Sequence, residues 1–459
     1  MSSSKGCTCA PHPRLDLTDA YIAYHRGAVS SDGPNGVALG PQFDQIRRKI
    51  HEACRSHGCF HVAIRCPIKP SNTSPLLPVQ CLAKDREEIE REIESLFSPN
   101  FLQDTLNNVE GDICNGGTLE ARFHNGSNNN VKHGIFRGRA AESGDEEQSR
   151  PEPKLSWEYQ RCCSTKQFLD ETTLCEDIKS TTIDESWKLL PQWTDALHSV
   201  AVAVIHVLGI PRGLALQEDS CSCSQTSTPN DCESKCNIDL LRVFRYDPLD
   251  SNDSALGSSA HSDWGSLTVV WQDDKGGLET YCNACNKWSS VDASCSDDPS
   301  SEEEDNDATI QCFVHIGDFL SLATIHESTE VPAWHSPRHR VSCPIKSPND
   351  ATTAHTSSYD NGCRRSLVYF AYPPPGIFLA DAQRVIGPFS GNNLSLGSIV
   401  GMDMYSVLHD QSGQTVMNIN KDTIACIKSE GSSKLMYEEI RNVPFDQVIA
   451  RKWGQVQRK

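Results

Sequence analysis

Two groups of residues in the second half of the chain are suited to chemistry. His261 and Asp263 are separated by one residue, with His339 far downstream, and Arg364 is separated by one residue from Ser366. Two imidazoles and one carboxylate bind Fe(II) on one face and leave its other positions open for small ligands and O₂. An arginine fork beside a hydroxyl is suited to holding a carboxylate. The pattern predicts an iron site next to a carboxylate-binding pocket.

The spacing within each group predicts how the backbone positions it. Residues two apart on an extended strand point to the same side of a sheet. We therefore expect His261 and Asp263 to reach one metal from a single strand, with His339 supplied by a distant strand. Arg364 and Ser366 are expected to share a face of another strand.

The sequence around these residues resembles the iron- and 2-oxoglutarate-dependent dioxygenases of the isopenicillin N synthase-like superfamily. That family's pattern is H-x-D-x-G-x-L-T, then a hydrophobic strand and Q-D-x-x-G-G-L, as in residues 261–278. Further matches follow in the family's order, and the resemblance extends with interruptions from about residue 14 to 375. These matches are a strand ending in Tyr246, G-D at 317–318, H-R-V at 339–341 and R-x-S at 364–366.

The resemblance implies a fold, a cofactor and a reaction. The expected fold is mainly β with flanking helices, a double-stranded β-helix or distorted jelly roll. Iron and 2-oxoglutarate would react with O₂, yielding succinate and oxidising a C–H bond of a small organic substrate by hydroxylation, desaturation or ring closure. The implied iron ligands are His261, Asp263 and His339, and the implied 2-oxoglutarate residues are Arg364, Ser366 and Tyr246.

Two other functions remain compatible with the same motifs. An oxidase of the isopenicillin N synthase kind would use the iron without 2-oxoglutarate, and the R-x-S pair would hold the substrate's own carboxylate. A catalytically inactive barrel would instead bind a ligand or partner through its loops, although the complete set of metal ligands argues against this. The substrate itself is not readable, because specificity resides in loops that match the family least.

Neighbouring residues compete for two of the assigned roles. His335 is an alternative to His339, but the Arg-Val pair that follows favours His339. Arg365 is an alternative to Arg364, but the two-residue step to Ser366 favours Arg364. Two more histidines, His315 and His326, are expected to be structural or exposed.

Composition limits the setting and the partners. The 459-residue chain has a formal net charge of -19, which argues against general affinity for nucleic acid or anionic membranes. It has no apolar run long enough for a membrane span, and its first residues have no apolar stretch typical of a secretory signal. We therefore expect a cytoplasmic protein that acts on a small molecule, most simply as a monomer.

The 21 cysteines are an odd number, which favours a reduced setting over a disulfide framework. Four of them lie in a polar stretch and two form a CxxC, but the spacing fits no common four-ligand zinc pattern closely. We expect loop thiols rather than a structural metal site. These residues are Cys221, Cys223, Cys232 and Cys236, and the CxxC pair is Cys282 and Cys285.

Changes in composition divide the chain. We expect a leader at 1–13, an N-terminal helical and strand region at 14–210, a catalytic core at 238–375 and a C-terminal cover at 376–459. Helices are predicted near 41–57, 84–97, 186–208 and 445–456. Strands are predicted at 240–246, 267–272, 277–281, 288–291, 312–316, 339–343 and 366–371.

Two polar segments, 294–307 and 346–362, are expected to be surface insertions in the core. The first has seven acidic residues in fourteen and is expected to be solvated. We expect a short turn to replace it without loss of iron binding.

Overall fold

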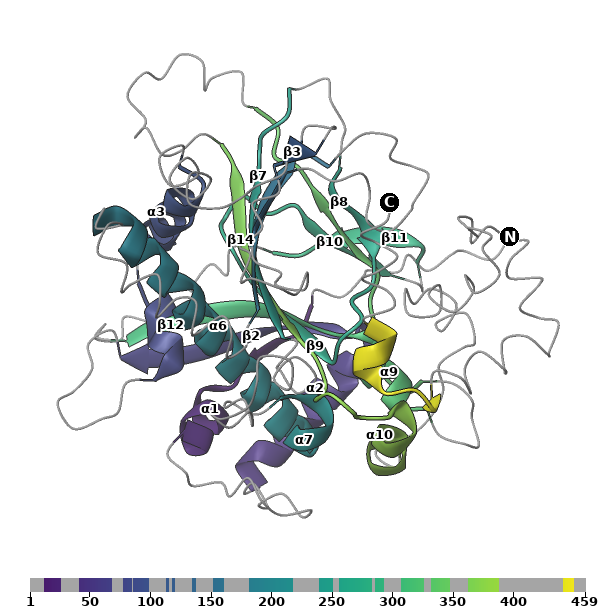
Figure 1. The fold of residues 1–459 in the computed structure, drawn as a ribbon. Coiled ribbons are helices and arrows are strands. Elements are labelled where there is room, and N and C mark those ends of the chain that lie inside the picture. The colour runs from purple at the N-terminus through teal and green to yellow at the C-terminus, as the bar shows by residue number, and fades with distance from the viewer. Residues whose placement is uncertain are drawn as a thin grey trace, which may run out of the picture.

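The chain forms two facing β-sheets with helices packed on the outside (Figure 1). The structure is a computed structural model. It describes residues 12–25, 41–67, 77–84, 86–98, 113–114, 118–119, 134–137, 152–160, 181–217, 239–250, 256–282, 285–292, 307–325, 332–346, 362–387 and 441–449.

The larger sheet has eight strands, and its order is not the order of the sequence. All of its pairs are antiparallel except β1 with β2. The N-terminal region therefore supplies both ends of the sheet, and the predicted catalytic core supplies its centre. From edge to edge the strands are β1 (Arg14–Asp16), β2 (Cys59–Pro67), β12 (Asp307–Ile316), β9 (Leu267–Gln272), β14 (Arg364–Ala371), β7 (Leu240–Tyr246), β6 (Lys154–Gln160) and β5 (Gly134–Arg137).

The smaller sheet has four antiparallel strands. In order they are β11 (Lys287–Ser290), β10 (Leu278–Cys282), β13 (His339–Ser342) and β8 (Leu256–His261). A separate two-stranded ribbon consists of β3 (Ile113–Cys114) and β4 (Thr118–Leu119).

Helices cover the outer face of the larger sheet. The long helix α6 (Thr181–Leu208) packs against β9, β14 and β7 and crosses the sheet in Figure 1. It ends at Gly209, whose positive φ of 74° is typical of a helix C-terminus. The other helices named in the described ranges are α1 (Thr18–His25), α2 (Pro41–Ser56), the 3-10 helix η1 (Pro78–Leu82), α3 (Arg86–Leu96), α7 (Arg212–Ala215), α9 (Asp318–Ala323) and α10 (Leu379–Ile386), and residues 445–449 are also helical. No helix in the described ranges is long and apolar enough to cross a membrane.

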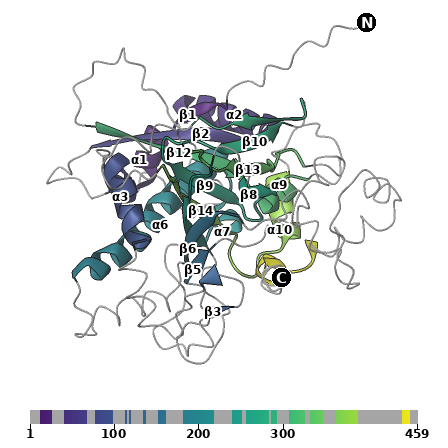
Figure 2. The same ribbon diagram turned by 90° about the horizontal axis from the view of Figure 1, so that it is seen from above.

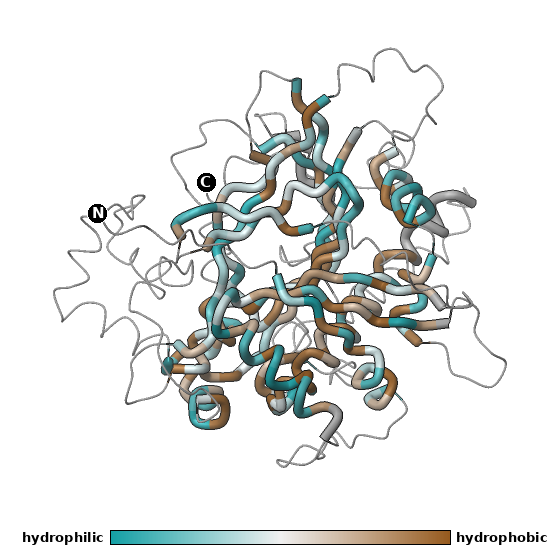
Figure 3. The backbone as a smooth tube through the Cα atoms, turned by 180° about the vertical axis from the view of Figure 1, so that it is seen from behind, coloured by the Kyte–Doolittle hydropathy of each residue, from teal (hydrophilic) through white to brown (hydrophobic). Residues whose placement is uncertain are grey.

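Two apolar cores result from this layering. The larger lies between the eight-stranded sheet and the helices, and it includes Trp193, Leu267 and Tyr369. The smaller, with Phe244 and Val341, lies between the two sheets. Figure 2 shows the layers from above, and Figure 3 shows apolar stretches in the centre of the larger sheet. The predicted double-stranded β-helix with flanking helices is confirmed.

The main differences from the sequence-based elements are in the strands. Strand β8 was not predicted, because its residues Leu-Gly-Ser-Ser-Ala-His have little hydrophobic alternation. Strand β12 begins at Asp307, five residues before the predicted start at Cys312. The Cys221–Cys236 cluster and His326 lie outside the described residues, as does nearly all of the two predicted insertions.

Candidate metal centre and carboxylate pocket

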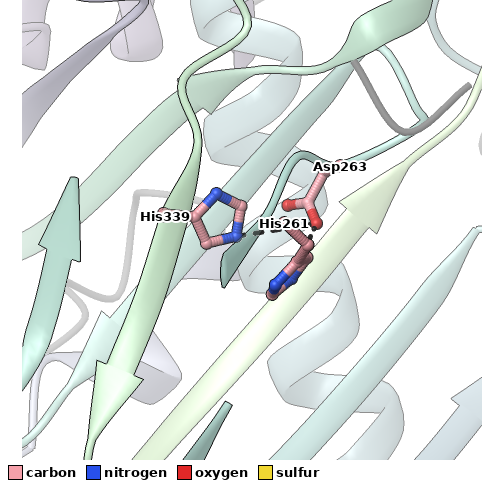
Figure 4. Close-up of side chains that lie close together, drawn as sticks. All are labelled: His261, Asp263 and His339. Carbon is pink, nitrogen blue, oxygen red and sulfur yellow. Dashed lines mark ion pairs between the residues drawn. The ribbon is translucent and has the colours of Figure 1, made fainter. Parts of the chain in front are cut away.

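The two histidines of the predicted metal site come from neighbouring strands of the smaller sheet. Strands β8 and β13 are antiparallel, and His261 and His339 are directly opposite each other in this pairing. Strand β8 ends at His261, and Asp263 lies in the loop that follows. The expectation that His261 and Asp263 share one strand was therefore wrong. The loop turns the Asp263 side chain back toward both histidines (Figure 4).

One oxygen of Asp263 faces both imidazoles. Its Oδ1 atom is 3.6 Å from Nε2 of His261 and 3.7 Å from Nε2 of His339. The candidate ligand atoms of the three residues all lie within 4.8 Å of one another. In the described part of the chain, no other cluster of His, Cys, Asp or Glu could hold a metal in this way.

Backbone carbonyls fix the orientation of both ligand imidazoles. Nδ1 of His261 donates to the carbonyl oxygen of Ser259 at 2.7 Å, and Nδ1 of His339 donates to that of Pro337 at 3.2 Å. A carbonyl can only accept, so each ring carries its proton on Nδ1 and presents the lone pair of Nε2 to the site. Such outer contacts set the tautomer and the ring direction of metal-binding histidines.

The electrostatics favour the protonation states that a metal requires. Burial alone raises the pKa of the Asp263 carboxyl group, but the imidazoles around it, that of His339 most strongly, leave this pKa below its ordinary value. Burial lowers the pKa of His339 well below its ordinary value. The site therefore presents an ionised carboxylate and a neutral imidazole, which are the forms that bind metals.

The buried carboxylate of Asp318 links the two loops that carry metal ligands. Its Oδ2 accepts a hydrogen bond from Ser262 at 3.1 Å and its Oδ1 accepts one from Ser336 at 2.6 Å. The backbone N–H of Asp318 also donates to the carbonyl oxygen of Asp263 at 2.7 Å. Residues beside Asp263 and shortly before His339 are thereby held by one side chain.

Two glycines of the family-like motifs allow this close packing. A Cβ atom on Gly317 would lie 2.1 Å from the carbonyl oxygen of Gly265, and one on Gly265 would lie 2.4 Å from that of Ala371. No side chain fits at either position without moving backbone. These glycines therefore bring the Asp263 loop against the start of α9 and the end of β14.

Arg364 is a fully buried cation on the inner face of the larger sheet. Its guanidinium donates to Oε1 of Gln272 at 2.9 Å, to Oγ of Ser366 at 3.2 Å and to the carbonyl oxygen of Gly276. It also lies 4.9 Å from the ring centroid of Tyr246, its cross-strand neighbour. Among the described residues it forms no ion pair. A buried cation with neutral partners is suited to accepting the carboxylate of a ligand.

The remaining candidates lie outside this arrangement. Arg365 points to the other face of the sheet and binds Glu94 of α3 at 2.7 Å, as its place one residue along the strand predicts. His335 is buried, with a pKa lowered to about 4 by that burial, and it does not join the metal-ligand group. Cys282 and Cys285 are partly exposed and lie in no metal-ligand group of the described residues.

The sequence interpretation expected His315 to be structural or exposed and did not place it beside the site. His315 on β12 is only 1% exposed, and its Nε2 atom lies 3.4 Å from Oδ2 of Asp263. Its ring centroid is 4.4 Å from that of His339. Strand alternation would have indicated it, because His315 shares a face with Phe313, which lies between the two sheets.

Comparison with known proteins gives structural matches alone. No family model matches the chain, and no curated protein does. A dioxygenase for auxin oxidation from rice is 16% identical, with 79% of this chain and 83% of that chain covered and a TM-score of 0.42. A full-length Neurospora crassa protein in complex with alpha-KG is 14% identical, with 79% and 85% covered and a TM-score of 0.40.

A 2OG-Fe(II) oxygenase family protein from Caulobacter crescentus is 13% identical, with 79% and 86% covered and a TM-score of 0.39. At identities this low, these likenesses say nothing about function, which has to be argued from the geometry of the chain's own site.

Proposed function

We propose that this chain is a non-haem Fe(II), 2-oxoglutarate-dependent dioxygenase that oxidises a C–H bond of a small organic substrate. The observation that carries the proposal is the convergence of His261 Nε2, His339 Nε2 and Asp263 Oδ1 inside a two-sheet barrel that also contains the buried cation Arg364.

The residues of the site fit both an iron ion and 2-oxoglutarate. Two imidazoles and one carboxylate form the donor set typical of non-haem Fe(II) oxygenases. Their carbonyl-bound Nδ1 atoms leave both Nε2 lone pairs directed inward. Arg364 and Ser366 offer N–H and O–H donors to the far carboxylate of 2-oxoglutarate, and the ring of Tyr246 lies against the same guanidinium.

Iron bound here would supply the redox chemistry that couples O₂ and 2-oxoglutarate to oxidation of a C–H bond. The chain would contribute binding, orientation and exclusion of water. Arg364 and Ser366 would orient the cosubstrate, and the apolar side chains between the sheets would keep solvent out. The His261 side chain is 28% exposed, against 7% for His339 and 5% for Asp263, so we place the substrate on the His261 side.

The test is anaerobic loading of the purified chain with Fe(II), followed by addition of O₂ and 2-oxoglutarate with a screen of small molecules. Succinate formation that requires iron and rises with one compound is the expected result. Substrate oxidation without 2-oxoglutarate would replace this proposal with an oxidase of the isopenicillin N synthase kind. Absence of both iron binding and turnover would leave a barrel that serves as a binding module.

A further inference from the structure

The two carboxylate oxygens of Asp263 have different surroundings. Oδ1 faces the Nε2 atoms of His261 and His339, at 3.6 and 3.7 Å. Oδ2 faces the larger sheet, where Thr268 Oγ1 donates to it at 2.5 Å and His315 Nε2 lies 3.4 Å away. One oxygen is therefore directed toward the candidate metal position and the other toward two side chains outside the candidate ligand group.

Strand pairing places these two side chains together. Thr268 on β9 and His315 on β12 are directly opposite each other in an antiparallel pair, so they project from the same face of the larger sheet. Both are 1% exposed. The candidate metal ligands belong to the smaller sheet and its loop, so the contacts with Oδ2 join the two sheets at the site.

The His315 ring packs beside the rings of Phe313 and His339, and its two nitrogens differ in their polar contacts. Its other nitrogen, Nδ1, is buried and has no hydrogen-bond partner among the described residues. Leaving a polar atom buried in this way costs stability. The polar contact that His315 does make is with Asp263. His315 also does not belong to the group of ligand atoms within 4.8 Å of one another.

We propose that Thr268 and His315 are positioning residues that hold Oδ2 of Asp263 and so restrict this carboxylate to one metal bond, through Oδ1. The inference rests on the proposed function, since it concerns the iron site. A carboxylate bound through both oxygens would occupy an additional position on the metal. With Oδ2 held, that position on the metal would stay open for other ligands.

The experiment measures binding of Co(II) alone to the full chain by calorimetry, with no cosubstrate or substrate. Thr268→Val and His315→Leu remove the donors, whereas Thr268→Ser and His315→Gln keep them. Loss of such an outer contact weakens metal binding by roughly 10–100-fold. We expect a loss of this size in Thr268→Val and in His315→Leu, and a clearly smaller loss in each conservative partner. His335→Leu, at a buried histidine outside the site, is expected to bind as the wild type does.

A crystal structure of the Co(II) complex gives the second readout. We expect a single Asp263 oxygen on the metal and a His315 Nε2 to Oδ2 distance within normal hydrogen-bond range, about 2.7–3.2 Å. Asp263 bound through both oxygens, or His315 bound to the metal, would overturn the inference. If His315→Leu fails to fold, the comparison of Thr268→Val with Thr268→Ser tests the inference, because Val and Thr have nearly the same shape.

The two proposals fail in distinguishable ways. A wild-type chain that does not bind Co(II) contradicts the proposed function. A wild-type chain that binds Co(II), together with Thr268→Val and His315→Leu variants that bind it equally well, contradicts the positioning role alone.

Discussion

Arg364 and Arg365 are consecutive residues of β14, but their guanidinium groups lie on opposite faces of the larger sheet. That of Arg364 lies between the sheets, bound to Gln272 and Ser366. That of Arg365 lies under α3, bound to Glu94 and Glu90. Strand alternation thus places two consecutive buried cations on opposite faces of the sheet, where they have different partners.

The first prediction distinguishes the roles of Arg364 and Arg365 by mutation. Arg364→Ala should weaken 2-oxoglutarate binding by about a hundredfold, since a charge-assisted contact in a buried site contributes a few kcal/mol. Arg365→Ala should lower the melting temperature, because it removes the ion pairs with Glu94 and Glu90, but should leave the 2-oxoglutarate affinity of the folded protein nearly unchanged. Titration of the iron-loaded variants measures the affinity. A cosubstrate defect in Arg365→Ala instead would mean that the assigned anchor is wrong.

The second prediction concerns the metal ligands. His261→Ala, Asp263→Ala and His339→Ala should each abolish stoichiometric iron binding, because each removes one of three donors. Circular dichroism should show the fold retained. His335→Ala is the matched control, since this buried histidine lies outside the ligand group and the variant should bind iron normally. Iron content near that of the wild type in His339→Ala would refute the assignment.

The third prediction concerns the carboxylate that links the two ligand loops. Asp318→Asn replaces one hydrogen-bond acceptor by a donor opposite Ser262 or Ser336. We expect the free energy of unfolding to fall by about 1–3 kcal/mol, the cost of a buried polar group left unsatisfied. Metal affinity should fall with it, because both loops lose their common anchor. Asp381→Asn, at an exposed carboxylate, provides the control. Unchanged metal affinity in a destabilised Asp318→Asn would show that the ligands hold their positions without this link.

The fourth prediction concerns pH and Glu90 of α3. Burial, together with the negative charge of Asp273, raises the pKa of Glu90 to about 7, although Arg365 opposes the shift. A carboxyl group whose pKa is higher in the folded state stabilises the fold when protonated. Its contribution is fully present below the unfolded pKa, near 4.5, and is lost as the pH rises through about 7.

Glu90→Gln mimics the protonated form and should therefore stabilise the chain at pH 8 but not at pH 4. After allowance for solvent screening we expect a gain of about 1 kcal/mol at pH 8. Thermal melts at both pH values measure the difference. Glu87→Gln, at an exposed position of the same helix, should show no such pH dependence. An equal effect of Glu90→Gln at both pH values would contradict the assigned titration.

The candidate metal site could be read from the sequence to the level of residue type and order. The H-x-D pair, His339, Arg364 and Ser366 occur in motifs whose chemistry is local. The structure brings His261, Asp263 and His339 together. The expectation that one strand carries both His261 and Asp263 was wrong, because β8 ends at His261 and a loop positions Asp263. Spacing of two residues is compatible with both geometries, so it cannot distinguish them.

Contacts between distant segments were not predictable in the same way. Oδ2 of Asp263 meets His315 because β9 pairs with β12, and Arg365 meets Glu94 because α3 docks on β14. The residues in each pair lie far apart in the sequence, and no local pattern specifies which surfaces will meet. Strand β6 was missed for a different reason. Its inner face carries Lys154, Ser156 and Glu158, so it lacks the hydrophobic alternation typical of a strand.

The last prediction concerns the acidic insertion before β12, and the structure changes how it should be tested. Asp292, just before the insertion, pairs with Arg14 at 3.6 Å, and Arg14 lies opposite His61 in β2. Asp307, the first residue of β12, lies opposite Pro67 in the same strand. The two ends are therefore separated by about six strand residues, or on the order of 20 Å.

A short turn is too short for this span, since each residue covers at most about 3.3–3.6 Å. We expect replacement of residues 294–306 by a linker of about ten Gly, Ser and Asn residues to preserve iron binding, because the linker reaches Asp307 with slack. A two-residue turn at the same place should instead pull β12 from β2 and lower the melting temperature. Iron content and thermal melts of the two variants measure this. Loss of iron from the ten-residue variant would show that the acidic segment itself supports the barrel.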